Sequence, residues 1–135
     1  MSRVVIVHVD DEEVVRRYMV GVFLRFMGLP IVQFESVRSF RDGASAIEAE
    51  QIVLITDGNL KDGICADVVM HAIQAWGIER LGRTAMVFSA SQQRDLQAVM
   101  DIVTSEGLAP HYIRKPANVA EFKAWWDQVR SNFGL

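Results

Sequence analysis

Several side chains that could bind a metal ion or a phosphoryl group follow short apolar segments of the sequence. Asp10 and Asp11 follow VVIVHV (4–9), Asp57 closes an apolar run within ITDGNLKDG (55–63), Ser89 follows AMVF (85–88), and Lys115 comes shortly after HYI (111–113). An aspartate in such a place is most often a turn-former that bonds the backbone just ahead of it. Asp10 and Asp11, taken alone, indicate a solvated helix start at the positive end of a helix dipole. Chemistry requires that these side chains meet.

Carboxylates that meet would need a positive partner. Two carboxylates about 4 Å apart repel by roughly 4 kcal/mol at an effective dielectric constant near 20. A Mg²⁺ ion, which proteins hold through one or two carboxylates, retained waters and a phosphoryl group, would offset that repulsion. Lys115 would add a second, fixed positive charge. The elements that carry these side chains decide whether they meet.

Short apolar segments alternate along the chain with longer segments of helical period. VVIVHV (4–9), IVLI (52–55) and AMVF (85–88) are typical of parallel strands that are buried on both faces. IVQF (31–34) and HYI (111–113) come directly after Pro30 and Pro110, and because proline removes a ladder donor, we expect these two strands at the sheet edges. The order βαβαβαβαβα predicts an α/β fold, a doubly wound five-stranded parallel sheet with helices on both faces.

Apolar residues at helical spacing mark three stripes that we expect to be buried. They are Val15, Tyr18, Met19, Val22 and Phe26; Leu96, Val99, Met100 and Val103; and Val119, Phe122, Trp126, Val129 and Phe133. A helix over 64–77 should stop at Gly77, and Asn118 should cap the last helix, 118–133. Asp42-Gly43 predicts a short or broken helix between 36 and 50.

Composition limits the class of protein. The chain has 135 residues, half of them hydrophobic, and no apolar run approaches the length of a membrane span. Its first residues lack a secretion signal, so we expect a cytoplasmic protein without a membrane partner. Cys65 is the one cysteine, which excludes an internal disulfide. A net charge of -3 argues against direct nucleic-acid binding.

The expected fold brings the chemical groups together. In an open parallel sheet, ligands bind outside the carboxyl ends of the strands, near the point where strand order reverses. The motifs VDDE, TDGNLKDG, FSA and YIRKP all follow or end strands, and they occur in this order. This combination resembles the receiver domain of the bacterial two-component response regulator family, over essentially the whole chain. The resemblance implies the flavodoxin-like strand order 2-1-3-4-5 and one receiver (phosphoacceptor) domain over residues 1–135.

The resemblance also implies a reaction and a metal site. Asp57 would accept a phosphoryl group from a phosphohistidine on a sensor histidine kinase or a histidine phosphotransfer protein, in a Mg²⁺-dependent reaction. Asp11 would bind Mg²⁺ directly and Asp10 largely through water. Asp57 and the backbone carbonyl of Asn59 would complete the protein ligands.

Further residues would bind the phosphoryl group or change conformation in response to it. By the same resemblance, Ser89 and Lys115 would bind the phosphoryl oxygens, and Tyr112 would move inward as Ser89 turns toward them. The family commonly uses its fourth helix, fifth strand and fifth helix to bind a downstream protein or to form a homodimer. We expect Trp125 to lie at the margin of the buried face there, beside Tyr112 and Ile102.

Three residues in or near these motifs have less specific interpretations. The family often has proline where this chain has Lys61, which we expect to be a solvated loop side chain. At the position of Cys65, the family frequently has a glycine. His8 lies in a buried strand, where a lone histidine is most often neutral and hydrogen-bonded, so it is given no role.

Other functional classes remain open. A Mg²⁺-dependent phosphohydrolase with an aspartyl-phosphate intermediate would share the aspartate nucleophile and the sheet. Such enzymes usually carry a D-x-D motif after the first strand, whereas this chain has VDDE. A phosphorylation-independent receiver-like interaction module is the third possibility. The presence of Asp57, Ser89 and Lys115 argues against this third possibility. We expect a phosphoacceptor signalling module and not an enzyme.

Overall fold

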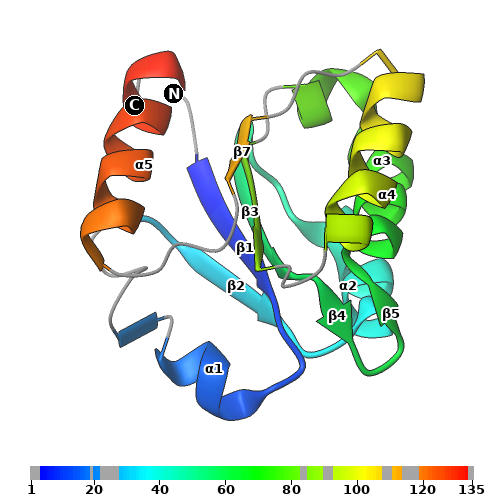
Figure 1. Ribbon diagram of the computed structural model, residues 1–135, viewed down its shortest axis with the longest axis horizontal. Helices are drawn as coiled ribbons and strands as arrows, with labels where there is room; N and C mark the ends of the chain where they lie inside the picture. Colours follow the sequence, from blue (N-terminus) through cyan, green and yellow to red (C-terminus); the bar gives the residue numbers. More distant parts are fainter. Residues whose placement is uncertain are drawn as a thin grey trace.

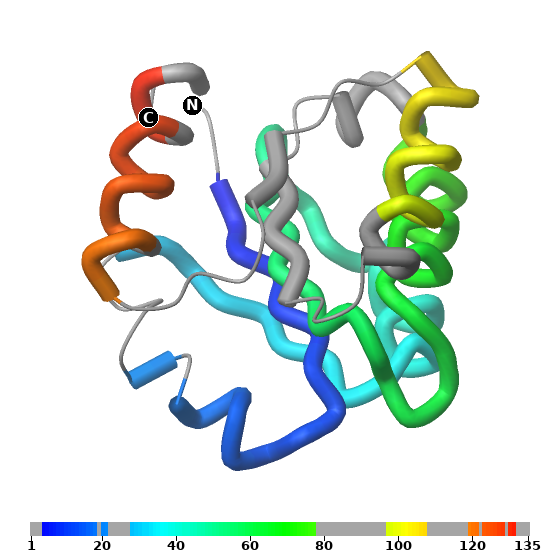
Figure 2. The backbone as a smooth tube through the Cα atoms, viewed as in Figure 1, coloured from blue at the N-terminus to red at the C-terminus, as the bar shows by residue number. Residues whose placement is uncertain are grey.

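The computed structural model describes residues 4–18, 20–21, 28–82, 85–89, 93–107, 111–113 and 119–133. Within these ranges, the side chains at 78–82, 85–89, 93–96, 111–113, 122, 129 and 132–133 are outside the description. Figure 2 shows the course of the backbone. None of the described helices is long and apolar enough to cross a membrane.

Five parallel strands form the central sheet. They are β1 (Val4–Val9), β2 (Ile31–Phe34), β3 (Gln51–Asp57), β6 (Ala85–Ser89) and β7 (His111–Ile113). Their order is β2-β1-β3-β6-β7, and each neighbouring pair is parallel. For these five strands in chain order, this is the predicted 2-1-3-4-5, and β2 and β7 lie at the edges as their prolines predicted. All of β1 and most of β3 are buried, as expected for strands covered on both faces.

Helices cover both faces of the sheet. They are α1 (Glu13–Tyr18), α2 (Val37–Gly43), the 3-10 helix η3 (Ala44–Ala46), α3 (Cys65–Gly82), α4 (Gln93–Ser105) and α5 (Val119–Phe133). Figure 1 shows α1 and α5 on one side of the sheet and α2, α3 and α4 on the other. The doubly wound architecture is therefore confirmed.

The region after β2 forms the short helix that the sequence predicted. Ser36 caps α2: its hydroxyl accepts a hydrogen bond from the Ser39 amide, and the Ser39 hydroxyl accepts one from the Ser36 amide, both at 3.0 Å. This reciprocal capping box satisfies two amides that the first helical turn leaves without partners. The chain then tightens into η3, whose Ala44 carbonyl accepts a hydrogen bond from the Trp76 indole at 2.9 Å.

An aromatic contact series holds α2 and α3 together beneath the sheet. Phe40 of α2 is buried, and its ring lies edge-on to Phe34 of β2 and to Trp76 of α3, with ring centroids 5.5 Å apart in both pairs. Edge-to-face pairs add to the free energy gained by burying the rings. Gly77 follows Trp76 with φ 79° and ψ 162°, so α3 breaks where the sequence predicted a stop and then resumes to Gly82.

Two expectations about helix faces are wrong. Tyr18 is 55% exposed and is not a core residue. Trp125 is 5% exposed and Trp126 is 4% exposed, so Trp125 is buried and does not sit at the margin of the face. A tryptophan ring is large enough to be covered from a marginal helix position. On α4 the predicted stripe is confirmed at Val99 and Val103, which are both buried.

Several expectations fall partly outside the description. Met19, Val22, Phe26 and the capping residue Asn118 lie outside the described residues. Four further side chains are also outside the description: those of Leu96, Phe122, Val129 and Phe133. Their burial stays a prediction.

Candidate functional site

Three carboxylates meet at the carboxyl ends of two neighbouring strands. Asp57 is the last residue of β3, and Asp10 directly follows β1. The two strands pair in parallel with Val9 opposite Thr56, so the register places Asp10 beside Asp57. One carboxylate oxygen each from Asp10, Asp11 and Asp57 lies within 4.8 Å of the others. The predicted meeting of these three side chains is confirmed.

Asp10 is the most buried member of this carboxylate cluster. It is 4% exposed, and Oδ1 accepts a hydrogen bond from the Glu12 amide at 3.0 Å. Burial raises the pKa of Asp10 to about 6, and the negative charges of Asp57 and Asp11 act in the same direction. The site therefore disfavours negative charge on Asp10 unless a cation is near.

Hydrogen bonds among Arg16, Gln33 and His8 stabilise the turn that follows β1. The Arg16 guanidinium donates from Nη1 to the Asp10 carbonyl at 2.7 Å. Gln33 of β2 donates from Nε2 to the Arg16 carbonyl at 3.1 Å, and the same nitrogen lies 2.9 Å from His8 Nδ1. Burial, followed by the Arg16 charge, lowers the pKa of His8 to about 4. His8 is therefore neutral and hydrogen-bonded at neutral pH, as predicted.

The loop after Asp57 forms a small hairpin, which the sequence analysis did not predict. β4 (Asn59–Leu60) pairs antiparallel with β5 (Gly63–Ile64), and Lys61 and Asp62 make the turn. The two-residue turn Lys61-Asp62 between Leu60 and Gly63, with a glycine directly after it, is the sequence signal that could have indicated it. Lys61 is exposed, as its interpretation as a solvated side chain predicted.

The hairpin is held to the start of α3. The Cys65 amide donates to the Gly58 carbonyl at 3.1 Å, and the Ile64 amide donates to Asp67 Oδ2 at 2.9 Å. A Cβ on Gly63 would lie 2.7 Å from that same Asp67 oxygen. A side chain at this position would therefore have to displace the Asp67 carboxylate. The position of Asn59, whose carbonyl is a predicted metal ligand, is fixed through this frame.

The other predicted site residues are placed only in part. The backbone of Ser89 lies opposite Asp57 in the β3–β6 pair, and that of Tyr112 lies opposite Met86 in the β6–β7 pair. The side chains of Ser89 and Tyr112 are outside the description, and Lys115 lies outside the described residues. Their roles stay predictions.

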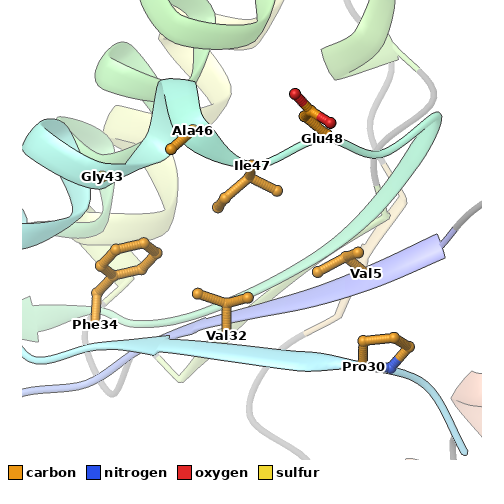
Figure 3. A pocket seen from close by; sticks show the side chains of 8 residues that line it. All are labelled: Val5, Pro30, Val32, Phe34, Gly43, Ala46, Ile47 and Glu48. Atoms are coloured by element: carbon orange, nitrogen blue, oxygen red, sulfur yellow. The ribbon is translucent and has the colours of Figure 1, made fainter.

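A second concave feature lies away from the carboxylate cluster. It is an apolar pocket of about 360 Å³ on the β2 side of the sheet. Its lining consists of Val5, Pro30, Val32, Phe34, Gly43, Ala46, Ile47 and Glu48. Figure 3 shows Val32 and Phe34 reaching from β2 toward Ile47, with the Glu48 carboxylate turned away from them. This lining offers no cluster of groups for phosphate or metal chemistry.

Solved structures share this arrangement of elements, although no protein-family profile and no curated protein sequence match the chain. The signal receiver domain of an HD domain-containing protein from Pseudomonas fluorescens Pf-5 is 14% identical, with a TM-score of 0.71 and 98% of each chain covered. The chemotaxis response regulator CheY4 of Vibrio cholerae is 15% identical, with a TM-score of 0.67; the alignment covers 95% of this chain and 99% of CheY4.

This chain has the receiver fold.

A third similar structure was obtained in the presence of a phosphate mimic. RcsB from Salmonella enterica serovar Typhimurium, bound to promoter rprA in the presence of the phosphomimetic BeF3-, is 15% identical with a TM-score of 0.65. The alignment covers 93% of this chain and 67% of RcsB. In the receiver fold of this chain, the strand order reverses between β1 and β3, and the carboxylate cluster lies at that point. This is where open α/β sheets bind their ligands.

Proposed function

We propose that this protein is a receiver module of a two-component signalling system, in which Asp57 accepts a phosphoryl group from a phosphohistidine. The observation that carries the proposal is the meeting of Asp10, Asp11 and Asp57 at the switch point of a receiver fold. The donor would be a sensor histidine kinase or a histidine phosphotransfer protein. The output would be a changed surface and not a released product.

The carboxylate cluster fits Mg²⁺ because it offers only oxygen donors, which this ion prefers. Asp10, Asp11 and Asp57 would hold it, together with the backbone carbonyl of Asn59. When bound, Mg²⁺ supplies positive charge that offsets the charges of the carboxylates and of the phosphoryl oxygens. The raised pKa of the buried Asp10 supports this assignment, since a bound cation would offset both its burial and the charges of Asp57 and Asp11.

Asp57 would act as the nucleophile. One of its carboxylate oxygens forms a bond to phosphorus as the bond between phosphorus and the imidazole nitrogen of the donor breaks, and the imidazole leaves with that electron pair. An aspartate is ordinarily ionised at neutral pH, so the step needs no separate base. Ser89 and Lys115 would hold the phosphoryl oxygens. The rigid β3 strand positions Asp57 for attack in line with the breaking bond.

Intact-mass measurement tests this proposal. The protein is incubated with acetyl phosphate or phosphoramidate and Mg²⁺, and Asp57→Asn is treated in parallel. Wild type should gain one phosphate mass, and Asp57→Asn should gain none. Equal labelling of the two proteins would remove Asp57 as the acceptor. Sustained turnover of small phosphomonoesters would favour the phosphohydrolase, and absence of labelling in both would favour a phosphorylation-independent interaction module.

The surface formed by α4, β7 and α5 is the proposed output face, with Ser89 and Tyr112 as the switch. Phosphorylation adds a charge of about -1.5 to -2 beside Ser89, whose backbone pairs with that of Asp57. The change would promote binding of a downstream protein or of a second copy. Light scattering with and without beryllofluoride measures self-association, and an unchanged mass with beryllofluoride bound would leave a protein partner as the output. Because Trp125 is buried, it is not assigned as an anchor of this face.

A further inference from the structure

Asp62 connects the hairpin after Asp57 to a helix that is distant in sequence. Its Oδ1 accepts a hydrogen bond from the Val37 amide at 2.9 Å, and its Oδ2 accepts one from the Arg38 amide at 3.0 Å. These are the first two residues of α2, 25 and 24 positions away. The bonds from Arg38 and Val37 lower the pKa of the exposed Asp62 carboxyl, so it stays ionised at neutral pH.

Two side chains share the first amides of α2. The Ser36 hydroxyl accepts a hydrogen bond from the Ser39 amide. The Asp62 carboxylate accepts hydrogen bonds from the two intervening amides, those of Val37 and Arg38. The first amides of a helix have no partners within the helix, so a carboxylate that binds two of them is favoured by geometry and by the helix dipole. A second contact lies beside this one: a Cβ on Gly63 would be 2.9 Å from Val37 Cγ2. The turn of the hairpin therefore rests on the first turn of α2.

The same hairpin begins at the proposed phosphoacceptor. Gly58 follows Asp57, and its carbonyl is bonded to the Cys65 amide. Asn59 pairs with Ile64 and Leu60 pairs with Gly63. Leu60 is buried in the core. With its base fixed to α3 and its turn fixed to α2, the hairpin leaves little freedom to the backbone carbonyl of Asn59.

We propose that Asp62 is a positioning residue that holds the hairpin against α2 and so sets the place of Asn59 beside the carboxylate cluster. Asp62 is not a ligand in this scheme, because both of its oxygens bind α2 amides. The inference rests on the proposed function, since it concerns the metal site that serves Asp57. It also makes the α2 amides of Val37 and Arg38 reporters of events at that site.

The test compares two variants that remove the same charge. Asp62→Asn keeps one acceptor oxygen for an α2 amide, and Asp62→Ala keeps none. Asp42→Asn is the matched control: Asp42 is an exposed acid of α2 that pairs with Arg41. Mg²⁺ affinity is measured by calorimetry, and the amide resonances of Val37 and Arg38 are followed by NMR during a Mg²⁺ titration and after addition of beryllofluoride.

In wild type, the Val37 and Arg38 resonances should shift with the same dissociation constant as that of Gly58. Asp62→Ala should weaken Mg²⁺ binding about tenfold, the usual size of losing a residue that orients a metal ligand, and should uncouple the two α2 amides from the titration. Asp62→Asn should lie between wild type and Asp62→Ala, and Asp42→Asn should match wild type.

Three results would overturn the inference: wild-type affinity and coupling in Asp62→Ala, equal losses in Asp62→Asn and Asp62→Ala, or the same loss in Asp42→Asn. The second and third would assign the effect to charge alone. Failure of the proposed function is a separate observation, because wild type would then gain no phosphate mass whatever the Asp62 variants do. Circular dichroism of each variant shows whether a loss reflects unfolding.

Discussion

Asp10 directly follows β1 and Asp57 ends the neighbouring strand β3, and their carboxylate oxygens lie within 4.8 Å of one another although Asp10 is buried. Mutual repulsion and burial act together on Asp10, whose pKa rises to about 6. Folding therefore brings together charges that disfavour one another in the absence of a cation. This conflict gives the site measurable properties in the metal-free protein.

Mg²⁺ should raise the melting temperature of wild type. A ligand that binds only the folded state stabilises it by mass action, by about 2.7 kcal/mol at a concentration one hundred times the dissociation constant. Asp11→Ala removes one predicted ligand and should abolish the shift. Differential scanning fluorimetry with increasing MgCl2 measures both, and NaCl of equal ionic strength is the control. A full shift in Asp11→Ala would place the metal elsewhere.

Asp10→Asn should stabilise the metal-free protein at pH 8 by roughly 2 kcal/mol, because it removes a buried charge whose pKa is raised from 3.8 to about 6. Between pH 4 and 6 the folded state binds more protons at Asp10, so its contribution to stability falls as pH rises. The contribution of His8 to stability has the opposite pH dependence. Folding lowers the pKa of His8 from 6.5 to about 4, so its contribution to stability rises with pH.

The two groups should nearly cancel in wild type between pH 4 and 6. Asp10→Asn leaves the His8 contribution alone, so the free energy of unfolding of this variant should rise across that window. Urea denaturation in EDTA at several pH values measures both profiles. Parallel profiles for wild type and Asp10→Asn would contradict the prediction.

Trp76→Phe should cost about 1–2 kcal/mol in the free energy of unfolding. The phenyl ring keeps much of the contact with Phe40 but leaves the Ala44 carbonyl without its indole donor. Trp76→Ala also leaves a cavity and should cost about 3–5 kcal/mol. Equilibrium denaturation gives both values. An equal cost for the two variants would show that the hydrogen bond, and not the ring, dominates the contribution of Trp76.

Gly63→Ala should destabilise the protein by about 1–3 kcal/mol and disturb the hairpin. The new methyl group would lie 2.7 Å from Asp67 Oδ2 and 2.9 Å from Val37 Cγ2, so it would displace the carboxylate that accepts from Ile64. Gly21→Ala is the matched control, because no atom of the described residues beyond its chain neighbours lies within 4 Å of the added carbon. Thermal denaturation of the pair measures the difference, and equal melting temperatures would mean that the hairpin adjusts freely.

The sheet and the carboxylate cluster follow from local sequence signals. β1, β3 and β6 are largely apolar runs that end in a polar residue or are followed by one, and the parallel pairing of β1 with β3 then places Asp10 beside Asp57. Pro30 and Pro110 indicate the edge strands because a missing amide has a direct cost in the interior of a sheet.

The errors lie where tertiary contacts decide the outcome. Helical spacing assigns an angle to Tyr18 and Trp125 but does not say how far each ring reaches or which neighbours cover it. The Asp62 contact was not predicted for a similar reason: a carboxylate in a turn could bond its own backbone, and only the folded structure brings the first turn of α2 beside it.

The chain carries its own probe for opening of this region. Cys65 is the one cysteine in the sequence, its side chain is buried, and its amide is bonded to the Gly58 carbonyl next to Asp57. A thiol reagent can reach the sulfur only while the surrounding structure is transiently open. The labelling rate of wild type, without any engineered cysteine, therefore counts local openings beside the phosphoacceptor, and its change with Mg²⁺ or beryllofluoride measures how firmly occupancy closes that region.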